Sequence, residues 1–437
     1  MRLSKQQIVI IAAGVLLVAV IFGAIFFNVR SQSGPGSPIF TLRIWGIDSK
    51  DAVEGALNGY KAGHPLATLN YTQIDPKNYY AALIDALASG QGPDVFYVGN
   101  RALPKYKNKI VPLNPALFPN MTVSNFRDLY PMAAEQDLIL GGQIYALPLY
   151  LDTMALIYNR DFFDQAGIVA PPKTWDEFQA DVAALRQVNQ NGQIVRAAAA
   201  IGGTEKTVEA GTDLLEFLML QNGAKMVSDN LSSASFASGE SGSNPGIAAF
   251  NFYLQFANST SRYYTWNEGQ PNSVDSFAAG KTAMIFAYQS ALAGIKNKSP
   301  FLNFAVAPMP QLSVSDAVVN YPRYHGLVVS KQSQNQNWGW DFVIYLATNT
   351  DSMTMYSGGH PPALRSLIAK KMSDLDLGLF ARQALTARSW YQVDDAQVDS
   401  ILNGAIQSVL SGAANSNTAL AQAQGQISQL MQADRQQ

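Results

Sequence analysis

The chain has 437 residues, of which 48% are hydrophobic and 11% aromatic, a composition typical of globular domains and not of disordered segments. Its formal net charge is −2 and only 14% of residues are charged, so it has no strong field to attract nucleic acid, and we expect no nucleic-acid partner. The absence of cysteine excludes disulfides, thiolate metal sites, a cysteine nucleophile and a lipid-modified N-terminal cysteine.

An apolar run opens the chain. Residues 8–27 carry no charged or polar side chain and would span about 30 Å as a helix, enough to cross a bilayer. Arg2 and Lys5 precede the run and only Arg30 follows it closely, which favours a cytoplasmic N-terminus. Residues 1–30 therefore predict a short cytoplasmic stub and a retained single-pass anchor in the cell membrane.

A cleaved signal peptide is the alternative interpretation of this run. Ser31 and Ser33 are small residues that could precede a cut. The apolar region of a signal peptide usually spans roughly 7–15 residues, which is shorter than this run. Residues 31–38, rich in Ser, Gly and Pro, predict a flexible linker in either case.

The next segment alternates strand and helix patterns. Strands are expected at 39–45, 69–72 and 94–98, with helices at 52–62 and 79–88 between them. This order implies a mostly parallel sheet. Ligands of such sheets gather at the carboxyl ends of the strands, where Trp45, Gly46, Gly99 and Asn100 would lie.

Residues 142–177 then predict a passage from one α/β lobe to another. A short apolar strand ends at Pro148, a second covers 153–158, and a helix begins near Asn159. After a break at two prolines, Thr174 and Glu177 form the spacing of a capping box.

These motifs resemble the family 1 extracellular solute-binding proteins, the capture subunits of ABC importers, of which the maltose-binding proteins are members. The shared pattern is roughly G-K-x-Y-G-x-P, L-x-Y-N-K-D-x-F and P-P-x-T-W-x-E-F, and further matches extend the resemblance over roughly residues 39–432. The resemblance implies an α/β, two-lobed periplasmic-binding-protein-like fold (type II) with a central cleft. It also implies an extracellular or periplasmic binding domain, a small-molecule solute as ligand, ABC permease subunits as partners, and no enzymatic activity.

The resemblance also suggests how the chain is divided. Lobe I would comprise 39–149 and 325–361, and lobe II would comprise 150–324 and 362–432. The chain would cross between lobes near 148–152, near 324–326 and near 359–362. A pair of C-terminal helices would cover 389–412 and 419–431.

A binding cleft needs stacking surfaces and hydrogen-bonding groups at strand ends. The candidate ligand-binding residues are Trp45, Gly99, Asn100, Asp152, Tyr288, Gln289, Tyr324, His325, Trp390 and Tyr391. The resemblance places Asp152 where a polar or acidic residue often contacts ligand. It matches the last two to an aromatic pair that lines the sugar cleft of maltose-type members.

Several of these residues have a structural alternative. Trp45 and Trp390 could be ordinary core residues, and His325 could be a hinge histidine without ligand contact. Asp152, if buried, would need a local partner. Two aromatic positions of the sugar binders are also missing, after the strand that ends at Gly99 and at Gln289. A carbohydrate is therefore the leading ligand class, with a smaller polar solute or a peptide as alternatives.

Catalytic motifs are weak in this sequence. Gly280-Lys281-Thr282 suggests a P-loop, but Asp275 occupies the position of its first glycine and would repel phosphate. The three histidines have no metal-binding spacing, and no nucleophile elbow or zinc-protease motif occurs, so we expect no catalytic residues, metal or cofactor. Two other functions stay open: a ligand-sensing or adhesion ectodomain without transport, and an anchored hydrolase, because glycosidase carboxylates leave no local motif.

Overall fold

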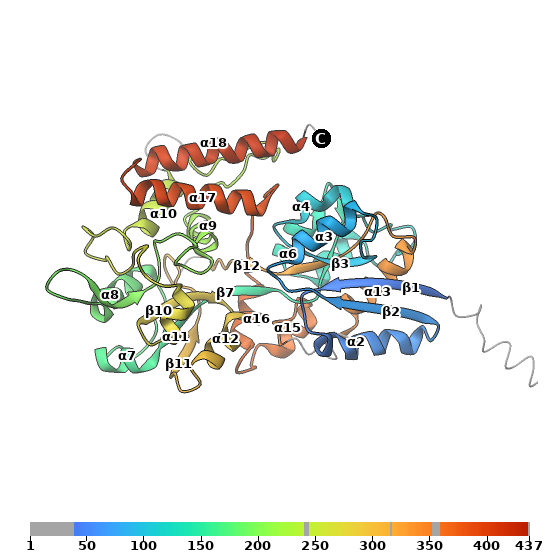
Figure 1. Ribbon diagram of the computed structural model, residues 1–437, viewed down its shortest axis with the longest axis horizontal. Coiled ribbons are helices and arrows are strands. Elements are labelled where there is room, and N and C mark those ends of the chain that lie inside the picture. Colours follow the sequence, from blue (N-terminus) through green and yellow to red (C-terminus); the bar gives the residue numbers. More distant parts are fainter. Residues whose placement is uncertain (1–38, 240–243, 315–316, 352–358, 436–437) are drawn as a thin grey trace, which may run out of the picture.

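The computed structural model describes residues 39–239, 244–314, 317–351 and 359–435. The predicted anchor at 8–27 and the linker at 31–38 lie outside these ranges. Within them, none of the helices combines the length and apolar character that crossing a membrane requires. Two lobes lie side by side along the long axis of the molecule (Figure 1).

Lobe I, as described, is built on a five-stranded sheet. Across this sheet the strands are β2 (Ala67–Gln73), β1 (Phe40–Gly46), β3 (Val95–Gly99), β13 (His325–Val329) and β6 (Leu147–Pro148). β1 runs parallel to both β2 and β3, as the alternation of strand and helix predicts, whereas β13 is antiparallel to β3. The other elements of this lobe are α2 (Lys50–Gly63), α3 (Tyr79–Ala88), α4 (Leu103–Tyr106), η1 (Lys107–Lys109), α5 (Val123–Leu129), α6 (Met132–Leu138), β4 (Ile139–Leu140), β5 (Gln143–Ile144) and α13 (Gln336–Thr348).

Lobe II is built on a mixed six-stranded sheet. Its strands are β11 (Phe304–Ala307), β7 (Asp152–Asn159), β10 (Thr282–Tyr288), β9 (Ile194–Ala199) and β8 (Gln187–Val188), with β12 (Pro322–Arg323) paired to the start of β7. β7 is fully buried over most of its length and antiparallel to both β10 and β11. The helices of this lobe are α7 (Arg160–Ala166), α8 (Trp175–Leu185), α9 (Gly211–Gln221), α10 (Pro245–Leu254), α11 (Ser273–Ala278) and α12 (Ala291–Lys298).

The chain passes between the two sheets at two neighbouring places. It leaves β6 and enters β7 through residues 149–151, and it leaves β12 and enters β13 through Tyr324. A third segment, 361–363, pairs with the first passage: the Leu151 amide donates to the Pro361 carbonyl and the Ala363 amide to the Leu149 carbonyl. The division into 39–149 with 325–361 and 150–324 with 362–432 remains a prediction, as does the role of these segments as hinges.

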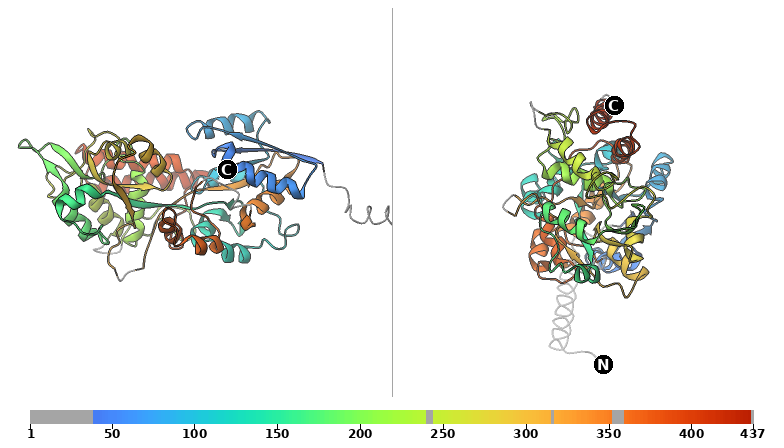
Figure 2. Two further views of the ribbon diagram at one scale, coloured as in Figure 1. Left: turned by 90° about the horizontal axis from the view of Figure 1, so that it is seen from below. Right: turned by 90° about the vertical axis from the view of Figure 1, so that its left-hand side faces the viewer.

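Within the described residues 359–435 the chain forms four further helices: α15 (Arg365–Lys371), α16 (Gly378–Ala384), α17 (Asp395–Leu410) and α18 (Ser416–Arg435). Ala363, Leu364 and Ile368 belong to the hydrophobic core of lobe I, so the segment that follows the third passage packs on both lobes. α17 and α18 lie together above α9 and α10, and the last turns of α18 extend toward lobe I (Figures 1 and 2).

Local sequence signals explain several helix ends. The Asn159 side chain caps α7, and Gly167 ends it in the left-handed conformation with φ 71°. Both hydrogen bonds of the capping box form between Thr174 and Glu177. The expected helix at 389–412 starts later, because Asp394 caps α17 and leaves 389–393 outside the helix.

Candidate functional site

A cavity of about 510 Å³ lies between the two lobes. From lobe I it is bounded by η1, α6 and the β4–β5 turn, and from lobe II by the end of α9, the loop after it and the last turn of α18. Its lining residues are Lys107, Gln136, Ile139, Leu140, Gly141, Leu220, Met226, Val227, Asn230, Leu231, Ser389, Trp390, Tyr391 and Arg435. The size is within the range of small-molecule sites, and the wall combines an apolar surface with a few polar groups.

The segment Ser389-Trp390-Tyr391 contributes one wall of this cavity. Trp390 is 6% exposed and meets Phe236 edge to face, with ring centroids 6.3 Å apart. The Trp390 indole N–H is buried and has no hydrogen-bond acceptor among the described residues. Tyr391 is half-buried beside it. The aromatic pair predicted from the sequence therefore lines a cavity between the lobes.

Asp137 fixes this segment to lobe I. Its carboxylate accepts hydrogen bonds from Asn100 Nδ2 at 2.9 Å, from the Tyr324 hydroxyl at 2.9 Å and from the Ser389 hydroxyl. Burial raises the pKa of Asp137 to about 6, against the lowering effect of these three hydrogen bonds. Asn100 and Tyr324 thus lie behind the cavity wall and act on it through Asp137 and Ser389.

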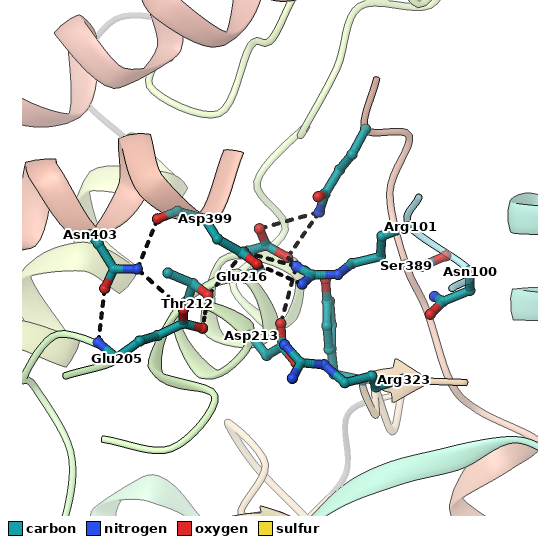
Figure 3. Close-up of polar contacts among 12 residues, drawn as sticks. Asn100, Arg101, Glu205, Thr212, Asp213, Glu216, Arg323, Ser389, Asp399 and Asn403 are labelled. Carbon is teal, nitrogen blue, oxygen red and sulfur yellow. Dashed lines mark hydrogen bonds and ion pairs between the residues drawn. The ribbon is translucent and has the colours of Figure 1, made fainter. Parts of the chain in front are cut away.

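A second polar contact between the lobes is centred on Arg101 (Figure 3). Its guanidinium enters a group of carboxyl side chains on α9 and α17 that we call the carboxylate socket, formed by Asp213, Glu216 and Asp399. Arg101 Nη1 lies 3.1 Å from Asp213 Oδ1 and 3.5 Å from Glu216 Oε2. Nη1 and Nη2 also donate to the two Asp399 oxygens at 3.1 Å and 2.9 Å.

The side chains of the socket are largely buried. Burial raises the pKa of Glu216, although Arg101 lowers it and the side chain accepts hydrogen bonds from the Tyr321 hydroxyl and from Gln392 Nε2. Although burial opposes it, Arg101 and Arg323 hold the pKa of Asp213 below its usual value. Arg323 Nε lies 2.9 Å from Asp213 Oδ2. The two guanidinium groups of Arg101 and Arg323 therefore pair with the carboxyl groups of the socket, as buried charged groups require.

Comparison with known proteins identifies the family. The model of the bacterial extracellular solute-binding proteins matches residues 46–353. The chain belongs to this family.

Individual relatives are distant in sequence, and the solved structures among them share the fold. A maltotriose-binding protein of Pyrococcus abyssi is 23% identical over 293 residues, which cover 62% of this chain and 54% of that protein. The cyclic alpha-maltosyl-1,6-maltose binding protein of Arthrobacter globiformis superposes with a TM-score of 0.73 at 16% identity, over 90% of this chain and all (100%) of the other. The sugar-binding protein MalE of Xanthomonas citri gives 0.71 at 19% identity, over 91% of this chain and 98% of the other.

In this solute-binding protein, Asp152 has partners within the protein. Its carboxylate accepts from the backbone amides of Thr153 at 2.8 Å, Gln289 at 3.0 Å and Ser290 at 3.1 Å. Burial raises the pKa of Asp152 to about 6, and these amides lower it in opposition. The carboxylate thus holds the end of β10 against the start of β7, and Gln289 Nε2 extends the contact to the Gly359 carbonyl at 2.9 Å.

The other candidates lie along the same interface without lining the cavity. Gly99 and His325 are paired across β3 and β13, and burial lowers the pKa of His325 to about 4. The Tyr288 hydroxyl donates to Asp213 Oδ2 at 2.5 Å, which attaches this residue to the socket. Trp45, at the end of β1, is half-buried against the core of lobe I. Their contact with ligand remains a prediction.

The structure can also be compared with the metal-binding and phosphate-binding motifs considered from the sequence. Among the described residues, no group of three His, Asp or Glu side chains is arranged to hold a metal ion. Gly280-Lys281 forms the turn between helix α11 and strand β10, an order opposite to the strand–loop–helix of a P-loop. The P-loop interpretation is therefore not supported by the fold around it.

Sequence reasoning missed the socket and much of the cavity wall. Arg101 follows the candidate Asn100 directly, so its place at a strand end was a usable signal. Nothing local marks Asp213, Glu216 or Asp399 as its partners, because two of them lie on an apolar-looking helix. The loop that supplies Met226 to Leu231 has no motif of its own.

Proposed function

We propose that this protein captures a carbohydrate between its two lobes and delivers it to an ABC importer. The observation that carries the proposal is the cavity between the lobes, with Trp390 and Tyr391 in its wall. Aromatic side chains present an apolar face to the C–H surfaces of a sugar ring, and neighbouring polar groups fix its orientation. Gln136, Asn230 and Ser389 supply such groups in the lining.

The ligands named for proteins of the same fold agree with this class. Solved neighbours are described with alpha-D-tagatose, cycloalternan, maltotetraose and mannotriose bound. Their identities to this chain are 16–21%, so they support a carbohydrate in general and no particular one. We further propose an extracellular or periplasmic binding domain that residues 8–27 tether to the cell membrane, since the family is extracellular.

The composition of the lining argues against the hydrolase alternative. Glycoside hydrolysis requires two carboxyl groups flanking the scissile bond. No Asp or Glu is among the described residues that line this cavity. We therefore propose binding and release of an unchanged ligand.

The proposal is tested by calorimetric titration of the purified full-length protein with a panel of mono- and oligosaccharides. Trp390→Ala should weaken the binding sugar by about 1–3 kcal/mol, the usual cost of truncating an aromatic anchor. Trp338→Ala is the matched control, because Trp338 stacks on Phe40 at 4.6 Å on the sheet of lobe I and lines no part of the cavity. If Trp390→Ala binds the sugar as tightly as Trp338→Ala does, the ligand-binding site lies elsewhere.

A further inference from the structure

Arg101 is a lobe I residue whose ion-pair partners all come from lobe II. It follows β3, and its neighbours Ala102 and Leu103 are fully buried in the lobe I core. Asp213 and Glu216 lie on α9, and Asp399 on α17, whose apolar faces form the lobe II core. A short, rigidly held segment of one lobe thus carries a guanidinium into the other.

The contact has the geometry of a specific interaction. The Arg101 side chain is 6% exposed, and its two-point contact with Asp399 uses both terminal nitrogens at 3.1 Å and 2.9 Å. Planar two-point pairing of this kind restricts orientation as well as distance. The Thr212 hydroxyl donates to Asp399 Oδ1 at 3.0 Å and so holds the carboxylate in place.

A second ion pair also joins lobe I to α17. Lys105 Nζ, in α4, is 3.0 Å from Asp394 Oδ2, and Asp394 is the residue that caps α17. The N-terminal turn of α17 is therefore bound to lobe I at two points. The aromatic pair Trp390-Tyr391 lies immediately before this turn, so the same contacts fix the position of that cavity wall.

Opening of the lobes would separate these groups. Arg101 would leave the socket, and among the described residues Asp213 would keep only Arg323 as a cationic neighbour. Arg101 contacts all three carboxyl groups of the socket, so separation must be accompanied by hydration of the groups that it leaves.

We propose that Arg101 is an interlobe latch, a positioning residue that keeps the two lobes together in the absence of any ligand by filling the carboxylate socket. Ligand-free protein then has a substantial closed population, and solute enters during openings that release Arg101 from Asp399. The proposal concerns the ligand-free protein, so it can stand or fail independently of which solute binds.

The experiment measures the distance between the lobes in the full-length protein without ligand. The chain contains no cysteine, so two introduced cysteines take spin labels at chosen sites only. Asp85→Cys on α3 and Gln422→Cys on α18 are exposed positions without side-chain partners among the hydrogen bonds and ion pairs of the described residues. Pulsed electron–electron double resonance then gives the distribution of distances between the two spin labels.

In the labelled parent we expect a major short-distance population. Arg101→Gln should increase the ratio of open to closed protein roughly tenfold or more, because one partner of a buried ion pair is removed. Asp399→Asn should shift the ratio in the same direction, and it provides the test if Arg101→Gln does not fold. Arg127→Gln, which breaks an exposed ion pair within lobe I, is the matched control and should leave the distribution unchanged.

Two results would overturn the proposal. One is a distance distribution that is the same in Asp399→Asn, in any folded Arg101→Gln protein and in the parent. The other is a ligand-free parent that is already entirely in the long-distance population, since the latch would then not hold the lobes together.

Discussion

Replacing Asp137 by asparagine should change how the stability of the protein depends on pH. Burial raises the pKa of this carboxyl from its ordinary value of 3.8 to about 6 in the folded protein. The folded state therefore binds more protons than the unfolded state between these two values, and stability falls as the pH rises through this range. With these values, Asp137 contributes about 1 kcal/mol more to the free energy of unfolding at pH 5 than at pH 7.

The assay is urea unfolding, followed by circular dichroism, at pH 5, 6 and 7 for the parent and for Asp137→Asn. An asparagine does not titrate, so the stability gained by the parent between pH 7 and pH 5 should shrink by about 1 kcal/mol in the variant. Asp152, whose pKa is also raised to about 6, is present in both proteins and cancels in the difference. Asp128→Asn, an exposed carboxyl on the neighbouring helix α5, is the control.

The comparison is between slopes, so the loss or rearrangement of hydrogen bonds at Asn100, Tyr324 and Ser389 does not affect the conclusion. If the parent and Asp137→Asn gain the same stability on going from pH 7 to pH 5, then Asp137 is already ionised at both pH values. The interpretation of this residue as a buried carboxyl that titrates near pH 6 would then be wrong.

Two further predictions concern the packing that places the site. Gly326→Ala should cost about 1–3 kcal/mol of unfolding free energy, because a Cβ at this passage between the lobes would meet the Ala146 Cβ at 2.7 Å; Gly404→Ala in α17, where no atom lies within 4 Å, should be neutral or slightly stabilising, and equal losses in both would refute the packing argument. Thr174→Ala should cost about 1 kcal/mol in the same urea assay through loss of the α8 cap, while Thr174→Ser retains it; a loss in the serine variant as large as in the alanine variant would contradict the capping role.

Local signals predicted the local structure well. The caps at Asn159 and Thr174 formed as the side-chain chemistry requires, and the apolar run after Asp152 became a buried strand. The family resemblance, carried by the same stretch, predicted the two-lobed α/β fold. These inferences rest on residues that are neighbours in sequence. Both partners of each interaction therefore lie within one short segment and can be recognised from it.

The site was predicted only in part, because its interactions are distant in sequence. Arg101 is 115 residues from Glu216 and 298 residues from Asp399, and no spacing rule connects them. Asp152 was predicted from a motif position to contact ligand, but its charge is satisfied by amides 137 and 138 residues away. Trp390 was predicted to line the cleft because the family resemblance matches it to an aromatic residue there. Its apolar character alone would have suggested an ordinary core residue.

The most direct test of solute capture is native mass spectrometry of the protein purified from its own host, with Trp390→Ala purified in parallel. The account predicts that the parent carries a mass increment equal to a carbohydrate, that the released sugar is unchanged, and that the variant loses most of it. A folded parent without any co-purifying carbohydrate, or a variant that retains the same sugar to the same extent, would contradict the assignment of the cavity between the lobes as the capture site.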